Sequence, residues 1–367
     1  MNTRVKRFVL PLGGAAIATG MIAASLTTAA AASSAAAPAS DGLATTQAAA
    51  LKTVKTWTAG NGKLLKAAAK FTDNSAVQGK IKLGGGDAAP DGKTGVVPPI
   101  GQEKVTPTKV KNVNLPRTIG KVFFMLDGKP YWCSGSSIQG KYHNLVATAG
   151  HCVYDVDGNR DTLDEWIFIP GYYQGKAPWG IYVGKSAYTH FDFANYEDFD
   201  SDYAFATVYN GVTAESWLSP EWKDAGRLGD NVGGQGFAWN QKIGQPVYVF
   251  GYPAGPHPDG DKPYSGHTPK YCYGKTSAAG AASAFKAEAQ IAVKCSFTAG
   301  ASGGPWITQY SSTKRLGYIN GVTSLVGDSD GNDRYDFATS PYFDSETYAV
   351  YNLASNLASG PIAKPVK

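Results

Sequence analysis

Apolar and polar residues alternate in short runs from about residue 117 to residue 345, and this spacing predicts β-strands. The runs Lys121–Leu126 and Tyr131–Ile138 flank Asp127-Gly128, a dipeptide that favours the tight turn of a β-hairpin. Further strands are predicted at Leu145–Thr148, Glu165–Ile169, Gly180–Val183, Tyr203–Val208, Pro246–Tyr252, Tyr271–Gly274, Ala287–Lys294, Pro305–Thr308 and Leu316–Ser324. A helical spacing then predicts one C-terminal helix over Ser345–Leu357. The pattern indicates an all-β unit of about 250 residues that does not need a second domain.

Residues 1–32 have the pattern of a secretory signal peptide. Arg4, Lys6 and Arg7 precede an apolar run from Phe8 to Leu26, and small residues follow. Pro11 and several glycines interrupt the run too often for a membrane span. We therefore expect a secreted, extracellular protein without membrane attachment once the signal is removed. In that compartment cysteines form disulfides.

Residues 33–116 are interpreted as a pro-region or flexible extension. Between residues 40 and 114 the chain holds eleven lysines and five acidic residues. The overall net charge of +5 therefore arises mostly in the precursor segments and does not point to nucleic acid. Leu51, Val54 and Trp57, followed by Leu64 and Leu65, have the spacing of a weak amphipathic helix. The apolar residues are too few for a separate core, and plain disorder without a role is the alternative.

A serine stands among glycines in Gly300-Ala-Ser-Gly-Gly-Pro305. Glycine reaches backbone angles closed to other residues, so the chain can turn sharply around Ser302 and aim its N–H groups at one point. The N–H groups of Gly300 and Ser302 would then form an oxyanion hole for acyl transfer. A glycine-rich turn without chemistry is the alternative, unless a base and its orienting acid occur elsewhere.

Both partners occur. His151 follows the apolar run Leu145–Thr148, and a neutral imidazole accepts and returns a proton near neutral pH. Asp202 directly precedes the alternating run Tyr203–Val208, where a carboxylate can accept the other imidazole N–H. Asp198 and Asp200 are nearby rivals, but neither directly precedes the run.

Three motifs, in this order, resemble the trypsin-like serine peptidases of the chymotrypsin fold: Thr148-Ala-Gly-His-Cys152, Asp202-Tyr-Ala-Phe205 and Gly300–Pro305. Gly120-Lys-Val-Phe-Phe124 and Phe250-Gly-Tyr-Pro253 are similar to the bacterial secreted branch that includes the glutamyl endopeptidases. The resemblance covers about residues 117–350. It implies His151 as general base, Asp202 as its orienting acid and Ser302 as nucleophile.

The resemblance also implies a fold. A peptidase domain over 117–367 would hold two six-stranded antiparallel Greek-key β-barrels, at about 117–225 and 226–345, with the active site in the cleft between them. Four cysteines allow three pairings. The resemblance implies a Cys133–Cys152 disulfide beside the base, which leaves Cys272–Cys295 by exclusion.

The same resemblance places the floor of a substrate-binding pocket near Ser296. One wall would lie on Thr323, Ser324, Leu325 and Val326. Neither an aspartate that would bind Arg or Lys nor the histidine of glutamyl-specific relatives is present there. We therefore expect a small or apolar side chain before the cleaved bond.

The sequence thus predicts a secreted, monomeric serine endopeptidase that acts on protein or peptide substrates without cofactor or metal. The acidic loops 155–161 and 328–333 lack the EF-hand order and are interpreted as solvated turns. The alternatives are an esterase with the same triad and a secreted binding protein that keeps the peptidase fold without turnover. The presence of all three catalytic residues favours an enzyme.

Overall fold

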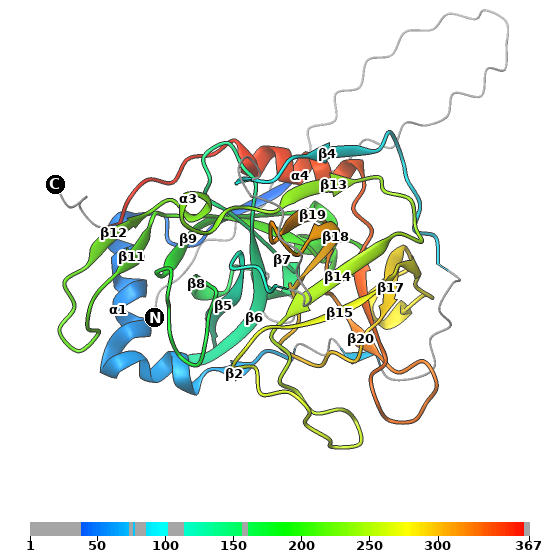
Figure 1. The fold of residues 1–367 in the computed structure, drawn as a ribbon, viewed down its shortest axis with the longest axis horizontal. Helices are drawn as coiled ribbons and strands as arrows, with labels where there is room; N and C mark the ends of the chain where they lie inside the picture. Colours follow the sequence, from blue (N-terminus) through cyan, green and yellow to red (C-terminus); the bar gives the residue numbers. More distant parts are fainter. Residues whose placement is uncertain (1–37, 73–75, 78–85, 102–113, 156–160, 363–367) are drawn as a thin grey trace, which may run out of the picture. The chain divides into compact units, whose positions relative to one another are not determined.

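The computed structural model describes residues 38–72, 76–77, 86–101, 114–155 and 161–362 (Figure 1). The predicted signal peptide lies outside the described residues. The helices are α1 Gln47–Ala67, α2 Phe191–Tyr196, α3 Leu228–Val232 and α4 Ser345–Ser355, with short 3-10 turns η1 Gly150–Cys152, η2 Phe199–Ser201 and η3 Ser283–Phe285. None of the described helices combines the length and apolar character needed to cross a membrane.

The described strands lie between residues 39 and 341. They are β1 Ala39–Gly42, β2 Ala69–Lys70, β3 Ala76–Val77, β4 Gly95–Val97, β5 Ile119–Leu126, β6 Lys129–Ile138, β7 Leu145–Thr148, β8 Asp164–Pro170, β9 Tyr182–Thr189, β10 Ala204–Val208, β11 Gly211–Thr213, β12 Lys223–Gly226, β13 Gly236–Trp239, β14 Pro246–Gly251, β15 Lys270–Lys275, β16 Ser277–Ala278, β17 Gln290–Lys294, β18 Pro305–Ser311, β19 Leu316–Val322, β20 Val326–Gly327 and β21 Phe337–Pro341.

Six of these strands close into an antiparallel barrel. Their order is β9-β10-β7-β6-β5-β8, and β8 pairs back with β9. The predicted hairpin is confirmed as β5 and β6, with Asp127 and Gly128 both at positive φ, as a tight hairpin turn requires. Val122, Phe124 and Phe168 have no exposed surface and fill the barrel interior. This unit carries both His151 and Asp202.

Besides the two-stranded sheet β11-β12, strands of the second half of the chain form two larger sheets, each with one strand from the predicted extension. One has the order β15-β14-β18-β19-β13-β4, and the other has the order β16-β17-β21-β20-β3. Val247, Val249, Ile291, Val293 and Trp306 form their shared core. The mostly β, two-barrel architecture predicted from the sequence is confirmed, and so is the C-terminal helix, which starts with a capping box between Asp344 and Thr347.

Most predicted strands have slightly different bounds in the structure, and two of them begin at least two residues later than predicted. The run Ala287–Lys294 becomes strand only from Gln290, because η3 precedes it and Ala287 donates its N–H to Ala282. The run Gly180–Val183 belongs to β9, which begins at Tyr182 and continues to Thr189. Both disulfides occur, Cys133–Cys152 and Cys272–Cys295. The second bond ties β15 to the residue that follows β17.

Several segments of the predicted extension pack against the barrels. Helix α1 contacts β8 and β9, with Val54 and Trp57 fully buried and the Trp57 indole N–H donating to the Glu165 carbonyl at 2.6 Å. Strand β1 pairs with β9, and β4 pairs with β13. The apolar residues that are too few for a separate core therefore join the core of the barrel.

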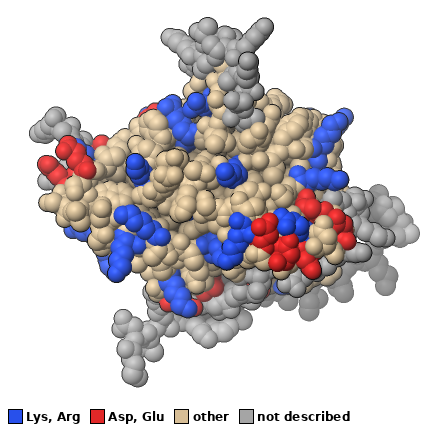
Figure 2. Space-filling model, turned by 60° about the horizontal axis from the view of Figure 1, so that its bottom comes forward, with Lys and Arg blue, Asp and Glu red and all other residues tan. Residues whose placement is uncertain are grey.

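Charged side chains are unevenly distributed on the face shown in Figure 2. Lysine and arginine side chains lie there in separate spots, whereas acidic side chains gather in groups. In one acidic loop Asp328 accepts backbone N–H groups from Asp330, Gly331 and Asp333. Nearby, Arg334 forms ion pairs with Asp259 and Asp261.

Candidate active site

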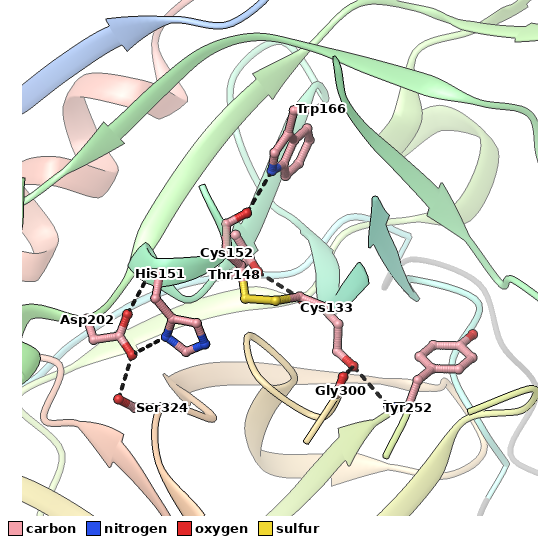
Figure 3. Close-up of a disulfide and its surroundings, with 10 residues drawn as sticks. Cys133, Thr148, His151, Cys152, Trp166, Asp202, Tyr252, Gly300 and Ser324 are labelled. Carbon is pink, nitrogen blue, oxygen red and sulfur yellow. Dashed lines mark hydrogen bonds and ion pairs between the residues drawn. A yellow bond between two sulfur atoms is a disulfide. The ribbon is translucent and has the colours of Figure 1, made fainter. Parts of the chain in front are cut away.

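Asp202 joins His151 to the second half of the chain. Its carboxylate accepts hydrogen bonds from the His151 backbone N–H at 2.9 Å, from His151 Nδ1 at 2.8 Å and from Ser324 Oγ at 2.6 Å (Figure 3). The side chains of His151 and Asp202 have no exposed surface. A carboxylate can only accept, so Nδ1 carries the proton and Nε2 of the neutral ring is left as the basic nitrogen.

Local structure explains why both residues lie where they do. β7 ends at Thr148, and η1 turns the chain so that His151 faces the end of β10. Gly150 allows this turn because an added Cβ would lie 2.4 Å from the Phe193 ring. Asp202 follows η2 directly and precedes β10, which pairs with β7. The two strands therefore bring Asp202 to His151.

Two aromatic rings lie parallel to the His151 imidazole. Phe199 is 6.1 Å away between centroids with an interplanar angle of 16°, and Phe71 is 6.2 Å away at 27°. Neither ring was identified from the sequence. Phe199 stands three residues before Asp202, and Phe71 comes from the predicted extension.

The loop that carries Ser302 is held by Ser134, the residue after Cys133. The Ser134 N–H donates to the Ser302 carbonyl at 2.8 Å, and its hydroxyl donates to the Gly300 carbonyl at 2.8 Å. The same hydroxyl accepts the Tyr252 N–H at 2.9 Å. Because Cys133 is bonded to Cys152, the neighbour of His151, this serine ties the Ser302 loop to the base. Sequence reasoning missed it.

Two peptide planes in this loop have fixed directions. The Ala299 carbonyl accepts N–H groups from Ala254 at 2.9 Å and Gly255 at 3.0 Å, and the Ala301 carbonyl accepts the Gly304 N–H at 2.9 Å. In a trans peptide the C=O and the following N–H point in opposite directions. The N–H groups of Gly300 and Ser302 are therefore aimed away from these contacts. Gly300 has φ +97°, which favours glycine.

Gly303 is the tightest point between the Ser302 loop and β7. It has φ +76°, and an added Cβ would lie 2.1 Å from Thr148 Oγ1 and 2.4 Å from the Ser134 carbonyl oxygen. We expect Gly303→Ala to displace the loop and lower the turnover expected at Ser302 by roughly a hundredfold or more, because a 1 Å misplacement of reacting groups has that effect. Gly128→Ala is the matched control, since Gly128 has φ +72° but a Cβ added there would meet no atom within 4 Å. Similar activity losses in both variants, measured on purified protein, would contradict the steric argument.

The predicted pocket residues differ from one another in their hydrogen-bond partners and burial. The Ser296 hydroxyl hydrogen-bonds the Tyr264 hydroxyl at 2.9 Å, and Thr323 Oγ1 accepts the Trp306 indole N–H at 3.1 Å. The Ser324 hydroxyl donates a hydrogen bond to Asp202 and so supports its carboxylate. Leu325 and Val326 are buried, and Val326 begins β20.

The rival acids lie away from His151. Asp198 accepts the Asp200 N–H, and the Asp200 carboxylate accepts N–H groups from Glu288 and Ala289. Burial raises the pKa of Asp200 to about 6, and the hydrogen bonds to its oxygens only partly counter this. Asp200 therefore braces the segment before β17.

The raised pKa of Asp200 predicts a pH dependence of stability. Between about pH 4 and pH 6 the folded protein holds the Asp200 proton more tightly than the unfolded chain. Its contribution to the free energy of unfolding is therefore largest at low pH and is lost as pH rises through about 6. We expect Asp200→Asn to flatten this part of the stability profile, measured by urea unfolding. Asp127→Asn, at an exposed turn, is the control and should follow the wild type.

Within the described part of the chain, one group of side chains has the composition of a metal site. It consists of His151, Cys133 and Cys152. Because the two sulfurs are bonded to each other, they are not open thiolate ligands.

Comparison with known proteins finds relatives among solved structures. No family model matches the chain, and no curated protein matches it. The protease Anisep from Arthrobacter nicotinovorans is 30% identical, with a TM-score of 0.54, over 66% of this chain and 97% of that one. The thermostable serine protease AL20 from an extremophilic microorganism is 28% identical, with a TM-score of 0.53, over 65% of this chain and 97% of that one.

Proposed function

The chain belongs to the trypsin-like serine peptidases of the chymotrypsin fold, which hydrolyse peptide bonds, and from this premise we propose that it is a secreted endopeptidase acting through an acyl-enzyme on Ser302. The observation that carries the proposal is the buried hydrogen-bonded pair of His151 Nδ1 and Asp202 at 2.8 Å. We further propose that residues 117–367 form the peptidase domain and that residues 33–116 are its pro-region.

In the proposed reaction, Ser302 Oγ attacks the carbonyl carbon of the substrate while His151 Nε2 takes its proton. Asp202 holds the imidazole in the required tautomer and stabilises the imidazolium. The N–H groups of Gly300 and Ser302 bind the oxyanion of the tetrahedral intermediate. His151 then returns the proton to the leaving amine, and a water activated by His151 hydrolyses the acyl-enzyme.

The fixed peptide planes support this assignment of the oxyanion hole. Preorganised donors need no reorientation as negative charge develops, and removing one donor typically costs about 10²–10³ in rate. Ala301 stands directly before Ser302, so this loop has no side-chain carboxylate at that position. Its backbone is held instead by Ser134, Ala254 and Gly255.

Labelling followed by turnover tests the proposal against its two alternatives. An organophosphonate is expected to modify Ser302, located by mass spectrometry, and the unlabelled enzyme to hydrolyse casein. Hydrolysis of simple esters but not of casein would favour an esterase. Failure to label Ser302, together with no hydrolysis, would favour a binding protein.

A further inference from the structure

A segment of the extension lies on the strand next to the Ser302 loop. Strand β2 pairs in parallel with Tyr131 and Trp132 of β6. The Phe71 N–H donates to the Trp132 carbonyl at 2.9 Å, and the Trp132 indole N–H donates to the Ala68 carbonyl at 3.2 Å. Cys133 and Ser134, which hold the base and the Ser302 loop, are the next two residues of β6.

Phe71 covers the imidazole of His151. Its ring is stacked on His151 and contacts Phe124 and Tyr131 edge-on at 5.1 and 5.6 Å. Only 8% of Phe71 is exposed, so the ring is inserted into the protein. A substrate side chain or leaving group beside His151 would compete with this ring for the same space.

Strand β3 of the extension lies against the second half of the protein. The backbone of β3 pairs in parallel with Val326 and Gly327 of β20. β20 follows Ser324, whose hydroxyl contacts Asp202. The chain then reaches Asp87, whose N–H donates to the Glu288 carbonyl at 3.0 Å. The described parts of this segment therefore contact a strand from each half of the protein, and Phe71 contacts His151.

The direction of this segment is opposite to that of a substrate. Thr323 lies at the Ser302 loop, where it accepts the Gly303 N–H, so β20 runs away from the nucleophile. The predicted pocket wall at Thr323–Val326 would place the residues before the cleaved bond along β20, with their C-terminal direction towards the serine. Such a substrate pairs antiparallel with β20, whereas β3 pairs in parallel.

We propose that the described segments 68–72 and 76–77 belong to a built-in inhibitor that occupies the substrate cleft in reverse. This inference rests on the proposed function, because it requires Ser302 and His151 to be catalytic. A chain that runs in the reverse direction fills the cleft but does not present a peptide carbonyl to Ser302 in the orientation that acylation requires. It therefore blocks the site and is not cleaved. Helix α1 anchors the inhibitor through Trp57, which is fully buried.

The experiment compares three intact full-length chains by the rate at which a small organophosphonate labels Ser302. These are the wild type, a Phe71→Ala/Val77→Pro variant that removes the ring and a backbone N–H of β3, and a Phe191→Ala control that removes an exposed ring of α2. The double variant is expected to label roughly tenfold faster or more, because reactivity follows the fraction of chains with an open site. The control should match the wild type. Equal rates in the wild type and the double variant would overturn the proposal.

A synthetic peptide of residues 66–78 tests the direction. Added to the double variant, it should inhibit casein hydrolysis and remain intact during long incubation. Cleavage of the peptide would mean that it binds as a substrate, and the reversed orientation would be wrong.

Hydrogen exchange separates this inference from the proposed function. In a Ser302→Ala chain, which cannot react, the backbone amide of residue 71 should be protected, and it should lose protection when Phe71→Ala and Val77→Pro are added. An unprotected Phe71 amide overturns the inhibitor even if Ser302 is the nucleophile. Protection of this amide with no labelling of Ser302 in any chain overturns the catalytic role instead, and the inhibitor with it.

Discussion

Ser302→Ala should lower kcat/KM for peptide hydrolysis by roughly a million-fold, because the loss of a nucleophile in such a triad has an effect of that size. The folded state should change little. Ser134 holds Ser302 through its backbone carbonyl, so removing the Ser302 hydroxyl leaves this contact in place. Melting temperature and the two disulfides are therefore expected to match the wild type. The measurement is hydrolysis of casein or a peptide by purified protein, with trace contamination excluded by phosphonate titration.

An exposed serine provides the control for this variant. Ser283→Ala, in η3, should keep full activity because its side chain is exposed. If Ser302→Ala retains more than about a hundredth of the wild-type rate, another group carries out the attack and the mechanism on Ser302 is wrong.

Sequence motifs were sufficient to predict the two-barrel fold and the proximity of His151 and Asp202. His151 and Asp202 each have a side chain with recognisable chemistry. The strands around them show a clear alternation of apolar and polar residues. The hairpin at Asp127-Gly128 was predictable for the same reason, since positive φ at both positions leaves few alternatives. These features can be predicted because their local sequence patterns are recognisable without knowing which distant residues they contact.

The supports of the site were not predictable in this way. Ala254 and Gly255 act through backbone N–H groups, which every residue except proline carries. Ser134 acts on a loop more than 160 residues away, and an isolated serine has no sequence signature for that role. The extension presents the same difficulty. Trp57 suggested at most a weak helix and Phe71 carried no prediction, because the surfaces that bury them come from the barrel.

Asp202→Asn should reduce kcat by about 10⁴ while leaving the fold intact, because it reverses the hydrogen bond that sets the tautomer of His151. An amide NH₂ facing Nδ1 donates instead of accepting, so the ring proton moves to Nε2 and the base is lost. The effect should appear in kcat more than in KM, since Asp202 is buried and has no surface to offer a substrate.

Ser324→Ala is a milder test of the same carboxylate, because it removes one of its three hydrogen-bond donors and keeps the other two. A hydrogen bond to a charged group contributes about 1.5–3 kcal/mol, and only part of this bears on the transition state, so we expect a loss of roughly tenfold. If Asp202→Asn and Ser324→Ala reduce kcat equally, the carboxylate acts only as a structural acceptor for the loop and does not set the tautomer of His151. A loss at least a hundredfold larger for Asp202→Asn would instead assign the dominant effect to the imidazole contact, because both variants disturb the same buried group.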